Sequence, residues 1–393
     1  MEWIELGDLA QINNGYAFKS KEYQDKGIRI IRITNVQKGH IEDSDPKFYD
    51  EKDMKDLEKF YLFEGDILIS LTGNVGRVAR VTKEILPAAL NQRVASIKPR
   101  QDINYDYLFH MMNSDMFENL CINESNGVAQ KNLGTTALAK IKIPVPPIET
   151  QKQIVGVLNE AQTLIGNRKE QIKLLDDLIE AIFYDMFGDP VKNEKRWEVE
   201  KLGKLGDLKN GMNYSRKDLG YTVKCIGVGD FKNLLEINNI DILSEIDLNS
   251  EPREEYLLKD GDILFVRSNG NRRLVGRNIA IYPGSDFVTF SGFCIRFRIT
   301  SRNIISKFLN YALHTKKLRN KLLQNIRGAN IQNLNQKMLY NLEIPVPPIH
   351  LQNQFAEKVE LIESQKQLLE ESLKLLEDNY NNLMQRAFKG EIF

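Results

Sequence analysis

The chain has 393 residues, and its 54 basic residues balance 54 acidic ones, so the formal net charge is zero. This length predicts two or three domains. The sequence contains no apolar run of about 18 residues, so no membrane span is predicted. The three cysteines lie far apart without paired spacing, which argues against a zinc cluster or a disulfide framework. We therefore expect buried thiols and a cytoplasmic location.

The first part of the chain mixes short β-rich runs, turn glycines and one helical stretch. Strands are expected at residues 28–33, 66–71 and 94–97, and a helix at residues 105–117. This mixture predicts a compact α+β domain.

A helical pattern follows the double proline at Pro146 and Pro147. Seam positions from Ile154 to Met186 alternate in steps of four and three, which is the spacing of a coiled coil. Thr150 and Gln153 have the spacing of a capping box at the start of this helix.

The whole pattern then repeats. IPVPPIETQKQI, from Ile143, returns as IPVPPIHLQNQF from Ile344, and YLFEGDIL returns as YLLKDGDIL. The second copy again predicts strands (residues 262–266 and 293–299), a helix (residues 304–323) and a seam that runs from Phe355 to Ala387. The chain is therefore a tandem duplication of about 200 residues, and each copy should hold its own domain.

The lengths of the connections predict how the two long helices pair. Each predicted helix runs for about 37 residues without an internal proline, which corresponds to about 55 Å. The link at residues 188–196 spans at most about 30 Å, so the chain cannot return along the first helix before the second domain begins. An antiparallel pair follows. Two helices packed separately on their own domains are the alternative.

The predicted fold class is α+β, with two similar globular domains separated by a long antiparallel two-helix coiled coil and related by a pseudo-twofold axis. The predicted parts are a first head (residues 1–147), a first helical spacer (148–188), a second head (189–348) and a second helical spacer (349–393).

Charge is segregated along the chain although it sums to zero. Residues 288–342 contain ten basic residues and no acidic one, whereas residues 236–260 and 42–58 are acidic. A basic stretch of this kind favours contact with nucleic acid in the second head.

Motifs for catalysis are missing from the sequence. It contains no phosphate-binding loop of the form G-x-x-x-x-G-K-[ST] and no H-E-x-x-H, and its four histidines are scattered. We therefore expect a protein that is not an enzyme, and we expect neither a metal nor a cofactor bound by this chain.

Polar loops suggest DNA binding instead. The loop at residues 267–277 holds four arginines among glycine, serine and asparagine, and its counterpart at residues 72–77 is shorter and less basic. Arginine forks can reach phosphates or guanine, and asparagine or glutamine can pair with adenine. Polar turns with solvated arginines are the structural alternative.

The candidate DNA-binding residues share a polar side chain in or near such loops. In the first head they are Lys19, Arg32, Thr72, Asn74, Arg77, Gln92, Arg93, Gln130, Lys131 and Asn132. In the second head they are Lys217, Arg267, Asn269, Asn271, Arg272, Arg273, Arg277, Asn330, Gln332 and Asn333.

The repeated IPVPPI-x-x-Q block before each heptad helix, the phrase MFGDPVKNEKRW and the ending QRAFKGEIF resemble the specificity subunit of type I restriction-modification systems. The resemblance covers essentially the whole chain. It implies two target recognition domains, each of which reads one half of a split DNA sequence, with the helices as ruler and docking surface.

The resemblance also implies partners. Modification subunits would methylate adenine with S-adenosylmethionine, and restriction subunits, where present, would translocate and cut with ATP and Mg²⁺. The adenine-methylase tetrapeptide [DNS]-P-P-[YF] is missing here, which agrees with a non-catalytic subunit. The alternatives are a fused restriction and methylation polypeptide, and a coiled-coil scaffold that binds proteins through its heads.

Overall fold

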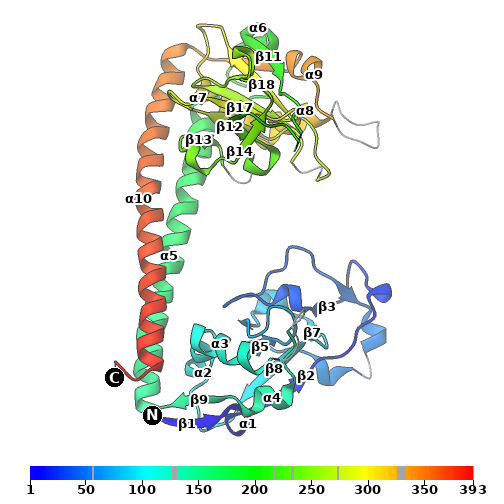
Figure 1. The fold of residues 1–393 in the computed structure, drawn as a ribbon, viewed down its shortest axis with the longest axis vertical. Coiled ribbons are helices and arrows are strands. Elements are labelled where there is room, and N and C mark those ends of the chain that lie inside the picture. The colour runs from blue at the N-terminus through cyan, green and yellow to red at the C-terminus, as the bar shows by residue number, and fades with distance from the viewer. Residues whose placement is uncertain are drawn as a thin grey trace. The chain divides into compact units, whose positions relative to one another are not determined.

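A computed structural model describes residues 1–54, 57–125, 131–215, 217–231, 234–271, 274–324 and 333–392. The chain divides into two compact units: unit 1 comprises Met1–Glu170 and Leu369–Phe393, and unit 2 comprises Gln171–Leu368. The division falls inside two long helices, α5 (Ile148–Phe187) and α10 (Ile349–Phe388), so each unit holds one head and part of both helices (Figure 1).

The head of unit 1 contains nine strands and four helices among its described residues. The strands are β1 (Glu2–Glu5), β2 (Ala10–Asn14), β3 (Ile28–Ile31), β4 (Phe48–Tyr49), β5 (Ile67–Ser70), β6 (Val78–Arg80), β7 (Ala88–Leu90), β8 (Val94–Pro99) and β9 (Lys142–Val145). The helices are α1 (Leu6–Leu9), α2 (Tyr105–Met112), α3 (Asp115–Glu124) and α4 (Thr135–Lys140). Short 3₁₀ helices are η1 (Ser20–Glu22), η2 (Ile33–Asn35), η3 (Glu51–Met54), η4 (Glu58–Phe60) and η5 (Lys83–Ile85).

The head of unit 2 repeats this order with one additional strand, β13. Its strands are β10 (Glu198–Lys201), β11 (Gly206–Asn210), β12 (Tyr221–Ile226), β13 (Glu236–Ile237), β14 (Glu245–Leu248), β15 (Asp262–Val266), β16 (Asn278–Ile281), β17 (Val288–Phe290), β18 (Cys294–Ile299) and β19 (Glu343–Val346). The helices are α6 (Leu202–Leu205), α7 (Ser306–His314), α8 (Lys316–Gln324) and α9 (Gln336–Tyr340), and the 3₁₀ helices are η6 (Val228–Phe231), η7 (Ile240–Ile242) and η8 (Glu254–Tyr256).

Three layers form the head of unit 1. A four-stranded sheet in the order β2-β8-β5-β6 lies between helices on one face and the three-stranded sheet β4-β3-β7 on the other. Side chains of β5 alternate between the two faces: Ile67 and Ile69 pack with α2, α3 and the long helices, whereas Leu68 packs toward the three-stranded sheet. All three side chains are fully buried.

The same layers recur in unit 2. Its larger sheet has the order β11-β18-β15-β16-β13, and the smaller one has the order β14-β12-β17. In β15, Ile263 and Phe265 face the helices while Leu264 and Val266 face the smaller sheet. The predicted α+β class and the duplicated heads are therefore confirmed.

The two long helices pair in antiparallel fashion within each unit. In unit 1, Gln162 Nε2 donates to Tyr380 Oη at 2.9 Å, and Lys169 pairs with Glu377 at 2.8 Å, so residue numbers rise in α5 as they fall in α10. In unit 2, Lys366 pairs with Asp176 at 2.6 Å. The antiparallel prediction is confirmed, and separate packing of the two helices is excluded.

The structure corrects two local expectations. Residues 105–117 and 304–323 do not form single helices: Ser114 begins α3 by accepting a hydrogen bond from the N–H of Phe117, and Thr315 separates α7 from α8. The capping box is also wrong, because α5 begins at Ile148 and Thr150 is already inside the helix.

A buried glutamine joins each head to its long helix. Gln151 Oε1 accepts the N–H of Asn104 at 2.8 Å, and Gln151 Nε2 donates to the carbonyl of Pro146 at 2.8 Å. Gln151 and its counterpart Gln352 are 2% and 0% exposed, which means that water cannot replace these partners.

The second copy of this joint has one further hydrogen bond. Gln352 Oε1 accepts the N–H of Ile305 at 3.0 Å, and Nε2 donates to the carbonyls of Pro347 at 2.7 Å and Asn303 at 2.9 Å. The repeated glutamine of the IPVPPI-x-x-Q block therefore has a structural role.

We predict that Gln352→Leu destabilises unit 2. The substitution leaves the N–H of Ile305 and two carbonyls without partners, and each buried polar group left unsatisfied costs about 1–3 kcal/mol. Chemical denaturation followed by circular dichroism measures the loss. Gln354→Leu, an exposed position two residues further along α10, is the matched control and should change little; equal losses in both variants would contradict the role of the joint.

His110 forms a second joint, in unit 1 alone. Its Nε2 lies 2.8 Å from Asn159 Oδ1 of α5, and its Nδ1 lies 3.1 Å from Tyr380 Oη of α10. Because the amide oxygen accepts, Nε2 is the donor and Nδ1 accepts from the tyrosine, which describes a neutral imidazole. Burial lowers the pKa of His110, and the hydrogen bond to Asn159 opposes this only in part.

We predict that acid weakens unit 1 through His110. As pH falls below about 6.5, the unfolded chain binds a proton on this imidazole while the folded chain does not, so the free energy of unfolding falls by at most about 1.4 kcal/mol per pH unit. Above that range both states are neutral and the effect vanishes. Unfolding of wild type and His110→Gln between about pH 5.5 and 7.5 tests this, with exposed His40→Gln as the control. Identical pH profiles for wild type and His110→Gln would contradict it.

Candidate nucleic-acid interface

Four segments of unit 1 meet at one end of β5. The N–H of Leu71 donates to the carbonyl of Arg93 at 3.0 Å, and the N–H of Leu133 donates to the carbonyl of Leu71 at 2.8 Å. The N–H of Gly73 binds the carbonyl of Lys131 at 2.9 Å. Backbone hydrogen bonds therefore fix the relative positions of loops that lie far apart in the sequence.

The fourth segment is the turn after β2. The N–H of Gln92 donates to the carbonyl of Tyr16 at 2.9 Å, and Tyr16 forms an isolated parallel bridge with Asn91. We call residues 14–16, 71–77, 91–93 and 131–133 the loop cluster of unit 1.

Unit 2 builds the same arrangement. The N–H of Arg267 donates to the carbonyl of Phe293 at 2.8 Å, and the N–H of Leu334 donates to the carbonyl of Arg267 at 2.9 Å. The N–H of Gly292 donates to the carbonyl of Met212 at 2.8 Å. Residues 210–212, 267–271, 274–277, 291–293 and 333–334 form the loop cluster of unit 2.

The repeated Asn-Gly pairs allow the strands to approach at these clusters. A Cβ placed on Gly15 would lie 2.2 Å from the carbonyl oxygen of Asn91, and one on Gly211 would lie 2.1 Å from that of Ser291. Both distances are far inside van der Waals contact, so only glycine fits. The shared glycine belongs to the common backbone of the clusters.

The hairpin loop after β5 differs from the one after β15. Both loops end in a Gly-Arg pair whose glycine has positive φ, +86° at Gly76 and +75° at Gly276. The same closing hydrogen bond joins Ser70 to Arg77 in unit 1 and Val266 to Arg277 in unit 2. The second loop is four residues longer, and its arginines lie within this longer segment.

The structure brings most of the described candidates of unit 1 into the loop cluster. Thr72 Oγ1 donates to Asn132 Oδ1 at 3.2 Å, and Asn74 is exposed at the tip of the hairpin loop. Gln92, Arg93 and Lys131 are exposed in the neighbouring turns. These six side chains therefore share one surface.

Lys19 and Arg32 are engaged elsewhere. Lys19 pairs with Glu22 at 3.2 Å, and Arg32 pairs with Asp45 at 3.6 Å and donates to its carbonyl at 2.6 Å. Their positive charges are balanced within the head.

In unit 2, the described candidates Asn269, Asn271 and Asn333 are exposed on the loop cluster, whereas Arg267 and Arg277 are half-buried. Arg267 donates to the carbonyl of Gly292 at 3.3 Å, and Arg277 donates to that of Phe231 at 3.2 Å.

Lys217 is exposed in the segment that follows β11. Gln130, Arg272, Arg273, Asn330 and Gln332 lie outside the described residues.

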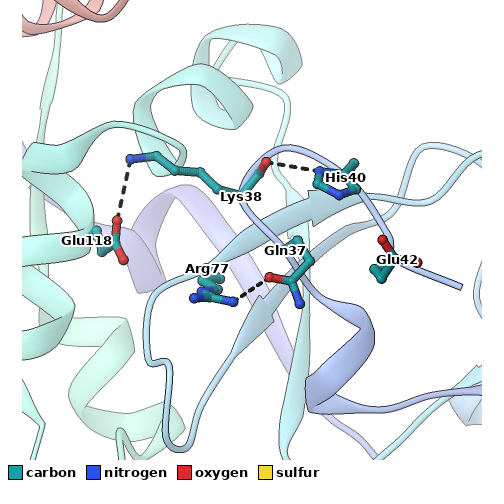
Figure 2. A pocket seen from close by; sticks show the side chains of 6 residues that line it. All are labelled: Gln37, Lys38, His40, Glu42, Arg77 and Glu118. Carbon is teal, nitrogen blue, oxygen red and sulfur yellow. Dashed lines mark hydrogen bonds and ion pairs between the residues drawn. The ribbon is translucent and has the colours of Figure 1, made fainter. Parts of the chain in front are cut away.

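A hollow of about 590 Å³ borders the loop cluster of unit 1. Its lining residues are Gln37, Lys38, His40, Glu42, Arg77 and Glu118. Figure 2 shows the guanidinium of Arg77 directed at the side-chain oxygen of Gln37, and Lys38 extended toward Glu118. Sequence reasoning missed Gln37, Lys38 and His40, because nothing in their spacing distinguishes them from an ordinary turn.

Lys38 is neutralised by acids of α3. Its ammonium contacts Asp115 and lies 3.4 Å from Glu118. Burial acts to lower the pKa of Lys38, but the hydrogen bonds and charges of these two acids outweigh it and raise the pKa overall. The same hydrogen bond lowers the pKa of Asp115.

Exposed aromatic side chains at the loop clusters were also missed. Phe293, at the position that corresponds to Arg93, is 61% exposed, and Tyr16 is 37% exposed. Aromatic rings beside basic and amide groups are typical of nucleic-acid surfaces. An aromatic residue directly after a glycine, Gly15 before Tyr16 and Gly292 before Phe293, is the signal that could have identified both.

The acid-free span at residues 288–342 is not one continuous basic surface. Its cations pair with acids from other parts of unit 2: Arg298 with Asp262 at 2.6 Å, Lys307 with Glu236 at 2.7 Å, Lys317 with Asp189 at 2.6 Å and Lys321 with Glu343 at 3.1 Å. Asp262 is 1% exposed, so this pair is a buried part of the framework. Four of the ten cations in this span are therefore compensated in space.

Among the residues that the structure describes, histidine, cysteine and carboxylate side chains form no group of three or more that could hold a metal ion. Cys121, Cys225 and Cys294 are buried and free, as expected, and burial raises the pKa of Cys121 to about 12. No helix in the described ranges has the length and apolarity needed to cross a membrane.

Comparison with known proteins gives the same family for both copies. The chain matches the family described as Type I restriction modification DNA specificity domain over residues 1–174 and 194–378. It is 25% identical to the specificity subunit of the type I restriction enzyme StySPI from Salmonella potsdam, with 98% of this chain and 88% of that protein covered.

Solved structures show the same fold. The S subunit of the type I restriction-modification system from M. genitalium is 16% identical, with a TM-score of 0.50 over 99% of this chain and 96% of that chain. A second structure, described as the basis of complex assembly and conformational transition of the type I R-M system, is also 16% identical. Its TM-score is 0.59, and the match covers 100% of this chain and 98% of that chain.

Each of the two α+β heads falls within a match to a family described as a DNA specificity domain. The chain belongs to the type I restriction-modification specificity subunits, because the family matches both copies of the repeat. The resemblance inferred from the IPVPPI blocks is confirmed.

We predict that Gly211→Ala disturbs the loop cluster of unit 2. The added methyl group would meet the carbonyls of Ser291 and Phe290, and such overpacking costs about 1–3 kcal/mol. Thermal unfolding measures the loss. Gly229→Ala is the control, since no atom lies within 4 Å of a Cβ at that position. An unchanged stability for Gly211→Ala would show that the strands separate without cost.

Proposed function

We propose that this chain reads a bipartite, asymmetric DNA target, one half with each head, and positions adenine-methylating modification subunits, and where present restriction subunits, on that DNA. The observation that carries the proposal is the pair of loop clusters. Both are held by equivalent backbone hydrogen bonds, yet they present unlike side chains.

A common backbone supports a common way of docking. Contacts to phosphates fix the orientation of a protein on the duplex, whereas base edges are read by individual side chains. Arg93 in unit 1 is replaced by Phe293 in unit 2, and the hairpin loop of unit 2 is longer and richer in arginine. Two heads with different readers on one chain suit two different half-sites.

Continuous helices support a fixed spacing between the half-sites. Helices α5 and α10 each have 40 residues without a break, and each runs from one unit into the other. At 1.5 Å per residue each is about 60 Å long, which suits a molecular ruler.

The proposal assigns the chemistry to other subunits. Modification subunits would supply adenine methylation with S-adenosylmethionine as methyl donor, and restriction subunits would use ATP and Mg²⁺. This chain would contribute recognition and placement, in line with a sequence that lacks the adenine-methylase tetrapeptide.

We predict that lengthening both helices changes the gap in the target and nothing else. Asp176 and Lys366 face one another, so four residues inserted after Leu175 and four after Lys366 extend both helices together. The extension is about 6 Å, which corresponds to one or two base pairs at about 3.4 Å each.

Mapping methylated adenines in a strain that carries the system, with the wild-type chain and with this variant, measures the result. Two short sequences at a longer fixed gap are expected. A changed half-site would contradict the ruler, and methylation that does not depend on this chain would contradict the function and favour a scaffold.

A further inference from the structure

The same helix borders the hairpin loop in both heads. In unit 1, a Cβ on Gly76 would lie 3.0 Å from Cβ of Cys121 and 3.4 Å from Cα of Glu118, both in α3. In unit 2, a Cβ on Gly276 would lie 3.2 Å from Leu323 and 3.6 Å from Leu322, both in α8. Helices α3 and α8 are therefore equivalent supports of the loop clusters.

The charge of this support is reversed between the heads. Asp115 and Glu118 of α3 correspond, 201 positions later, to Lys316 and Arg319 of α8. In unit 1 the two acids bind Lys38 and so neutralise the surface beside Arg77. In unit 2 the equivalent positions add positive charge.

Helix α8 separates its cations onto two faces. Lys317 and Lys321, one turn apart, pair with Asp189 and Glu343 and hold the helix against the rest of unit 2. Lys316, Arg319 and Leu323 follow one another at steps of three and four on another face, and Leu323 touches the Gly276 turn. Lys316 and Arg319 therefore lie on the face of α8 that borders the hairpin loop.

Positive charges gather at this place. The pKa of Arg319 is lowered, mainly by burial and also by the nearby charge of Arg277. The pKa of His314, the last residue of α7, is lowered mainly by desolvation and also by the charges of Arg319 and Arg277. Lys316 stands in the first helical turn, where the helix dipole disfavours a cation, while α3 places acids there.

We propose that Arg277, Lys316 and Arg319 form a phosphate-binding surface beside the loop cluster of unit 2, which grips the DNA backbone next to the second half-site. We call these three residues the basic face. The proposal rests on the proposed function and refines it: the second head supplies more of the sequence-independent affinity than the first, where acids occupy two of the equivalent positions.

The proposal is tested by measuring how the full chain binds a long mixed-sequence DNA duplex between about 50 and 200 mM salt. The quantity compared is the slope of the logarithm of the association constant against the logarithm of the salt concentration. Arg319→Gln and Lys316→Gln should each reduce the slope by about 0.9, which is one phosphate contact. Arg319→Lys retains the charge and should restore the wild-type slope.

Arg302→Gln is the matched control, an exposed arginine of unit 2 beyond the other end of β18. Circular dichroism shows whether each variant is folded. Because Lys316 is exposed, Lys316→Gln still tests phosphate binding by the basic face if Arg319→Gln prevents folding.

If both Arg319→Gln and Lys316→Gln kept the wild-type slope, the phosphate-binding role of the basic face would be refuted, whereas the proposed DNA binding of the chain would not. A slope lowered equally by Arg302→Gln would also overturn it, because any lost charge would then suffice. A wild-type chain without salt-dependent binding would instead refute the proposed function itself.

Discussion

The side-chain amides of Gln151 and Gln352 each hold a half-buried backbone N–H and a proline carbonyl where a long helix begins. A proline offers this carbonyl without an N–H that would need its own partner. Both amides are out of reach of water, so neither joint can loosen without leaving polar groups unsatisfied. The direction in which each head leaves its helix is set here, and the position of both loop clusters depends on it.

In the loop clusters, repeated residues form the framework, whereas divergent side chains such as Asn74, Arg93 and Phe293 face solvent. Asn-Gly pairs allow close strand approach, and Gly-Asp turns close when Asp66 and Asp262 accept backbone N–H groups at 3.0 and 2.8 Å. Charge follows the same division. The cations that pair inside unit 2 stabilise its layers, whereas Lys316 and Arg319 replace the acids of the first copy beside the hairpin loop.

Periodicity and repetition in the sequence were sufficient to predict the duplicated heads and the antiparallel helices, because seam spacing and link length are local quantities. Breaks at Ser114 and Thr315 were missed, since a polar cap inside an apolar pattern does not interrupt the pattern. Thr72, Asn74, Gln92, Arg93, Lys131 and Asn132 were chosen from loop chemistry, and they lie together. Lys38 could not be foreseen, because its acidic partners are about 80 residues away in the chain, and the pairing of the acid-free span was hidden for the same reason.

The sequence of the joint, IPVPPI-x-x-Q, occurs twice in the chain, and this has an evolutionary consequence. Genes that encode IPVPPI-x-x-Q at two places can recombine there, and a head moved in this way would meet a helix start that offers the same proline carbonyl. One difference to be accommodated is Tyr311, which donates to Glu363 in unit 2 and corresponds to His110 between Asn159 and Tyr380 in unit 1. New DNA specificities could thus arise by exchange of whole heads, without the slow refinement of an interface.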